Sequence, residues 1–108
     1  FKGCSRLKTL GLSHTKATDI GLAHFKDCKD LAIVDLNGTR ITSAGLAPFK
    51  ECKDLTYLHI NETKIGDDGL AHLASLQKLT GLSLRQTAVT NQGLEHIKNC
   101  KGLGSLDL

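Results

Sequence analysis

The sequence predicts an α/β fold made of stacked units, each with one strand and one short helix. Three observations predict it. A unit of 24 residues recurs along the whole chain, its first half alternates apolar and polar residues, and its second half places apolar residues three apart. Alternation is typical of a strand and the wider spacing of a helix. One such unit cannot bury its own apolar edge, so the units must pack against one another.

Three apolar columns mark the strand half of the unit. The first is leucine throughout: Leu7, Leu31, Leu55, Leu79 and Leu103. The second lies three residues further on: Leu10, Val34, Leu58, Leu82 and Leu106. The third follows two residues later: Leu12, Leu36, Ile60, Leu84 and Leu108. Since the side chains of a strand alternate between its two faces, these columns point inward and the residues between them point outward.

The helix half begins after a threonine column and contains a glycine–leucine pair in every copy. The threonines are Thr15, Thr39, Thr63 and Thr87. A second threonine precedes the expected helices at Thr18, Thr42 and Thr90 and predicts their N-caps, while Gly66 takes this position in the third copy. Pro48 is expected to shorten or kink the second helix, because proline fits poorly in a helix interior.

These columns resemble the leucine-rich-repeat family, whose strand signature is L-x-x-L-x-L-x-x-N/C-x-L. The resemblance covers all 108 residues. It implies a right-handed solenoid, a horseshoe segment with a parallel β-sheet on the concave face and short helices on the convex face. Threonine stands where the family usually has Asn or Cys, and we expect its buried hydroxyl to bond to the backbone of the neighbouring loop.

The unit looks more like that of bacterial leucine-rich-repeat proteins than like the cysteine-containing subtype of F-box substrate receptors. The latter usually has Cys where Thr39 stands, and a slightly longer unit. We expect one leucine-rich-repeat domain over residues 1–108. Its four full repeats are 7–30, 31–54, 55–78 and 79–102, with partial repeats at both ends.

The ends of the chain suggest that it is a fragment of a longer protein. There is no initiator Met, and Phe1 aligns with Phe25, inside the expected helix of a preceding repeat. Neither end shows a polar capping segment. Because an uncapped solenoid exposes its core, the ends would allow self-association.

Composition excludes several classes of partner. A formal charge of +3 with no aromatic interleaving argues against nucleic acid. The apolar runs are too short for a membrane span. The lysines of the helix half alternate with acids and predict a solvated face of mixed charge: Lys26, Lys50 and Lys98, with Lys29, Lys53 and Lys101.

The cysteines and most histidines also have structural interpretations. Cys4, Cys28, Cys52 and Cys100 share one repeat position, which predicts buried free thiols. Neither they nor the helix-side His24, His72 and His96 can converge on a metal, so we expect no metal and no cofactor. Unpaired thiols and the absence of a signal-peptide pattern favour a cytoplasmic location.

The concave face contains the candidate binding site. Alternation places Tyr57 and Arg85 there, surrounded by four polar residues: Asp35, His59, Asn61 and His14. Aromatic and arginine anchors within a polar surround are typical of protein-binding sites. We therefore expect Tyr57 to be exposed and this face to bind a protein partner.

The same face places Asp35, His59 and Ser83 in a row, in the order of a hydrolase triad. Adjacent parallel strands lie about 4.8 Å apart, so the three side chains are neighbours. Backbone N–H groups inside a sheet are already bonded, which leaves no oxyanion hole, and Ser83 lacks the G-x-S-x-G elbow. We expect no enzyme activity.

The sequence thus predicts a protein–protein interaction module of unknown partner. Two alternatives stay open beside it. One is the substrate-recognition repeat region of an F-box-type ubiquitin ligase, which the cysteine-containing resemblance permits. The other is a structural spacer between domains.

Overall fold

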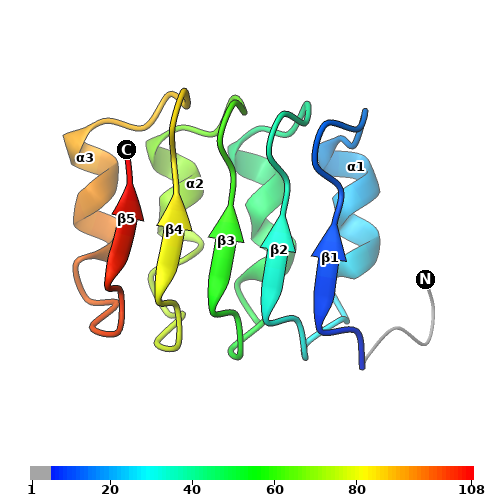
Figure 1. Ribbon diagram of the computed structural model, residues 1–108, viewed down its shortest axis with the longest axis horizontal. Helices are drawn as coiled ribbons and strands as arrows, with labels where there is room; N and C mark the ends of the chain where they lie inside the picture. The colour runs from blue at the N-terminus through cyan, green and yellow to red at the C-terminus, as the bar shows by residue number, and fades with distance from the viewer. Residues whose placement is uncertain (1–5) are drawn as a thin grey trace.

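The computed structural model of the protein describes residues 6–108. Within that range, five short strands form one parallel sheet in chain order: β1 (Thr9–Gly11), β2 (Ile33–Asp35), β3 (Tyr57–His59), β4 (Gly81–Ser83) and β5 (Ser105–Asp107). Figure 1 shows the strands side by side, with the helices forming a second layer behind them. The expected α/β solenoid is confirmed.

Each of the first four strands is followed by a short helical segment that starts at the predicted position. The segments are α1 (Asp19–Leu22) continued by η1 (Ala23–Phe25), η2 (Ser43–Phe49), α2 (Asp67–Ala71), and α3 (Asn91–Leu94) continued by η3 (Glu95–Ile97). The N-cap positions are Thr18, Thr42, Gly66 and Thr90, as expected, but of the three threonines only Thr90 uses its side chain as a cap, accepting the N–H of Gln92.

Pro48 acts differently from the prediction. It does not shorten its segment, since η2 runs over seven residues, but the whole segment is a 3₁₀ helix. The proline therefore coincides with a change of helix type.

The core lies between the two layers. Strand residues of the second apolar column face it, with Val34 and Leu58 fully buried. The helices contribute Leu22, Leu46 and Leu70 from the glycine–leucine pairs, which are also fully buried. The apolar columns of the sequence therefore meet in one continuous core.

The threonine column bonds to its own loop instead of the neighbouring one. The buried hydroxyls of Thr39 and Thr63 donate to the carbonyls of Leu36 and Ile60, each at 2.8 Å. In these loops, asparagine side chains make hydrogen bonds to the next repeat. Asn37 Oδ1 accepts the N–H of Asn61, and Asn61 Oδ1 accepts the N–H of Arg85, both at 2.7 Å.

A second set of side chains joins successive repeats at the start of the helices. Asp19 accepts the N–H and the hydroxyl of Thr42, at 2.8 and 2.5 Å. Asp67 accepts the same two groups of Thr90, at 2.6 and 2.5 Å. We call these pairs Asp–Thr clasps. Between them, Ser43 Oγ accepts only the N–H of Gly66, at 3.0 Å.

Acid is expected to weaken the Asp67–Thr90 clasp. The hydroxyl and N–H of Thr90 hold the pKa of the Asp67 carboxyl below its ordinary value of 3.8. Since the folded pKa is lowered, the carboxylate stabilises the fold above the ordinary value, and this contribution disappears as pH falls through the folded pKa. Urea denaturation over this acid range should show a shallower loss of stability for Asp67→Asn than for wild type.

The neighbouring Asp68 provides the control, because it is exposed and takes part in no clasp. Asp68→Asn should keep the acid dependence of the wild type. Equal slopes for wild type and Asp67→Asn would contradict the assignment of the clasp as an acid-sensitive contact.

The cysteine prediction holds for two positions and is wrong for one. Cys52 and Cys100 are free and buried, and burial raises the pKa of the Cys52 thiol to about 11. Cys28 is disulfide-bonded, and Cys4 lies outside the described residues. A shared repeat position therefore does not require that all the cysteines at it are free. The thiol argument for a cytoplasmic location therefore does not extend to Cys28.

Candidate functional site

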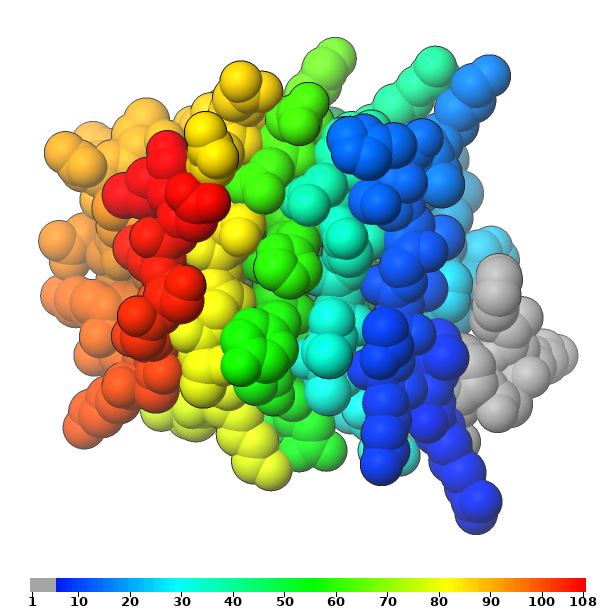
Figure 2. Space-filling model, viewed as in Figure 1, coloured from blue at the N-terminus to red at the C-terminus, as the bar shows by residue number. Residues whose placement is uncertain are grey.

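The exposed side of the sheet, which we call the sheet face, carries two large apolar side chains. Tyr57 is 45% exposed and Ile33 39% exposed, and they are paired in register on adjacent strands. On the next strand Gly81 pairs with Tyr57, and a Cβ there would lie 2.7 Å from Tyr57 Cδ1. The phenol ring thus lies over Gly81, where a larger residue would displace it. Figure 2 shows the molecule from this side.

The middle row of the sheet face holds the three residues in hydrolase order. Asp35, His59 and Ser83 are paired in register, and His59 Nδ1 lies 3.4 Å from Ser83 Oγ. Asp35 instead accepts the N–H of Asn37 at 3.1 Å, and no ion pair joins it to His59 within residues 6–108. The N–H of Leu84, the residue after Ser83, is bonded to the carbonyl of Asp107, so it is not free to form an oxyanion hole. This row therefore offers polar hydrogen-bonding groups without a connected proton relay.

Asn61 and Arg85 lie together where the strands end. Their shared hydrogen bond uses the side-chain oxygen of Asn61, which is half-buried. Arg85 Nε lies 3.9 Å from Asp107 Oδ1, and both side chains are more than half exposed, so this ion pair contributes little. A shallow polar hollow of about 200 Å³ is lined by Asn61, Glu62, Arg85 and Gln86. The guanidinium is available to a partner.

His14 lies apart from the other candidates, in the turn after β1. It has a left-handed backbone with φ 57°, as do Glu62 and Gln86 at the same repeat position, while Gly38 fills it in the second repeat. The ring of His14 lies over Gly38, since a Cβ there would come 2.4 Å from Nδ1 of His14. Gly38 was the only sign of this turn in the sequence.

No group of three or more His, Cys, Asp or Glu side chains among residues 6–108 could hold a metal ion. Over the same residues, no helix has the length and apolar character needed to cross a membrane.

Comparisons with known proteins agree with this architecture. Residues 51–74 match the family model described as Leucine Rich repeat. No curated protein sequence matches the chain significantly. Internalin C2 from Listeria monocytogenes has a similar structure, with a TM-score of 0.85 at 23% identity over 96% of this chain and 42% of that one. An internalin (inlF) from the same species gives 0.65 at 18% identity, over 96% and 35%.

The fold is therefore a parallel α/β repeat solenoid. The matched segment is one unit of a pattern that recurs in register through five strands, so the chain is similar to the leucine-rich-repeat proteins along its described length. It spans less than half the length of the two internalins. Its bacterial or cysteine-containing subtype stays a prediction.

Proposed function

We propose that the protein is a protein–protein interaction module that binds its partner on the sheet face. The leucine-rich-repeat family and fold support such a role in general. The observation that carries the choice of face is the exposed pair Tyr57 and Ile33, set beside the polar row of Asp35 and His59. An exposed apolar centre within a polar surround is typical of a protein-binding surface.

Tyr57 and Arg85 are the proposed anchors. Tyr57 offers an aromatic ring supported from below by the backbone at Gly81, so little rotamer freedom remains to be lost on binding. Arg85 offers an exposed guanidinium held by only one distant carboxylate. His59, Asp35 and Asn61 would supply hydrogen bonds around them, and His14 would extend the surface beyond the first strand.

The double variant Tyr57→Ala/Arg85→Ala is expected to bind the partner at least about thirtyfold more weakly, since a single anchor residue costs about 2 kcal/mol or more. The partner would be recovered with immobilised protein from the source cells, and its affinity then measured by titration calorimetry. Circular dichroism should show that the double variant is folded like the wild type, because the side chains of Tyr57 and Arg85 are exposed.

Ile20→Ala/Glu95→Ala is the matched control, since both residues are exposed on the helical segments. It should bind like the wild type. Full affinity of the Tyr57→Ala/Arg85→Ala variant would reject the sheet face as the binding surface. A chain that binds nothing through this face would favour the spacer alternative, and an F-box-like segment in the full-length protein would favour the ubiquitin-ligase alternative.

A further inference from the structure

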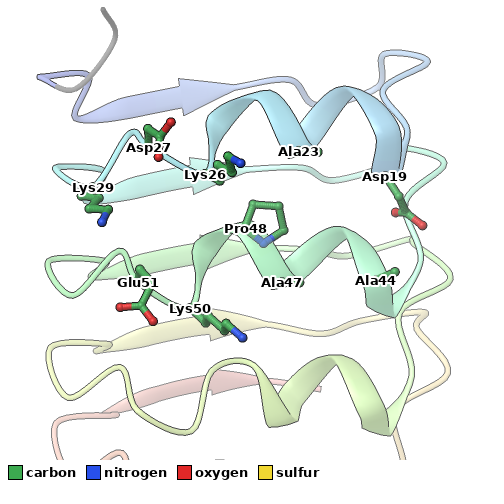
Figure 3. A pocket seen from close by; sticks show the side chains of 10 residues that line it. All are labelled: Asp19, Ala23, Lys26, Asp27, Lys29, Ala44, Ala47, Pro48, Lys50 and Glu51. Atoms are coloured by element: carbon green, nitrogen blue, oxygen red, sulfur yellow. The ribbon is translucent and has the colours of Figure 1, made fainter. Parts of the chain in front are cut away.

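A groove of about 530 Å³ opens among the helical segments, between η1 and η2 (Figure 3). Ala23, Ala44, Ala47 and Pro48 give it an apolar lining. The other repeats carry histidine at the position of Pro48, namely His24, His72 and His96. The second repeat therefore has an apolar ring where the other repeats have a larger polar residue.

Charged side chains surround this apolar lining. Lys26 and Lys50 directly follow η1 and η2, and Figure 3 shows them on either side of Pro48. The ion pairs of the described residues involve Lys78, Arg85 and Lys98, so Lys26 and Lys50 have no carboxylate partner within 4.0 Å there.

The acidic residues of the groove lie toward its two ends. Figure 3 shows Asp27 and Glu51 near the loops that follow the helices, and Asp19 at the opposite end. Both oxygens of Asp19 already accept hydrogen bonds from Thr42. Lys29 lies at the same end as Asp27 and Glu51, so that end has mixed charge. The middle of the groove is therefore basic and apolar, and the opposite end carries Asp19.

We propose that this groove is a second interaction surface, which binds an acidic segment of a protein partner. Carboxylates of the segment would lie between Lys26 and Lys50, and an apolar side chain would cover Ala47 and Pro48. Charge complementarity selects this occupant, because the two unpaired ammonium groups gain a partner on binding. The carboxylates at the ends repel a continuous polyanion, which disfavours nucleic acid.

Binding can be tested with a short fluorescein-labelled peptide that is rich in glutamate and has one central leucine. Fluorescence anisotropy at low salt should show saturable binding that weakens as salt screens the charges. Lys26→Gln/Lys50→Gln should weaken binding by about fivefold, the effect expected from losing two exposed ion pairs. The control Lys16→Gln/Lys64→Gln removes the same charge from the loops that precede the helices and should bind like the wild type.

Three results would overturn the proposal. One is an equal loss in both double variants, which would mean attraction to net charge alone. Another is undiminished binding of a peptide with serine in place of leucine, because the apolar lining would then be unused. The third is equally tight binding of a single-stranded oligonucleotide of the same charge. Circular dichroism of each variant verifies that it is folded. The tests with the serine-containing peptide and with the oligonucleotide use the wild-type protein, so they do not depend on the folding of a variant.

Discussion

Replacing Gly93 with alanine is expected to lower the free energy of unfolding by about 2–3 kcal/mol, the upper part of the range for forcing extra atoms into a packed site. A Cβ at Gly93 would lie 2.4 Å from Asp67 Oδ1 and 3.0 Å from Asp67 Cα. The carboxylate could move only by giving up its bonds to Thr90, and the backbone atom cannot move without shifting α2. Chemical denaturation would measure the loss.

Gly21 is the matched control, since it occupies the same repeat position in α1. A Cβ there meets no atom within 4 Å. Gly21→Ala should therefore leave the protein as stable or raise its stability by about 0.5–1 kcal/mol, because alanine favours helix over glycine. If Gly21→Ala and Gly93→Ala lost the same stability, the glycine column would reflect something other than contact between repeats.

Phe49→Ala is expected to have the largest effect, a loss of about 3–5 kcal/mol in the free energy of unfolding. Phe49 is fully buried and ends η2 in the middle of the stack. Because each repeat packs only on its neighbours, a cavity here weakens the second repeat's contacts on both sides. Denaturation followed by circular dichroism would measure the loss.

Leucine at the same position makes a sharp comparison. Leu73 fills the equivalent site of the third repeat and is fully buried there. Phe49→Leu is therefore expected to cost less than about 1.5 kcal/mol, as swaps that nearly conserve volume do. A loss from Phe49→Leu as large as that from Phe49→Ala would show that the ring shape, and not the filled volume, decides stability at this position.

The repeat period made most of the fold predictable. Apolar columns such as those of Leu31 and Leu58 recur in the same register, so an error in one copy is corrected by the others. The helix starts were equally accessible, since Thr42 and Thr90 precede them. The exposure of Tyr57 followed from alternation alone.

The remaining features depend on contacts between repeats, which no single copy displays. Asp19 and Thr42 are far apart in sequence, and their residue types alone do not predict that they form a clasp. The glycine column was visible, yet at Gly45 and Gly93 its cause is an aspartate carboxylate of the preceding repeat. The turn at His14 was hidden because Glu62 and Gln86 adopt its left-handed backbone without glycine.

The clasps also constrain how such a chain can change length. Asp19 and Asp67 stand two repeats apart, as do Thr42 and Thr90, while Ser43 and Gly66 form the joint between them. Deleting the repeat 31–54 would set Asp19 against Gly66, which has an N–H but no hydroxyl to donate. Deleting both 31–54 and 55–78 would set Asp19 against Thr90 and form a complete Asp–Thr clasp. Gain or loss of repeats in pairs therefore preserves this chemistry, whereas single-unit changes disturb it.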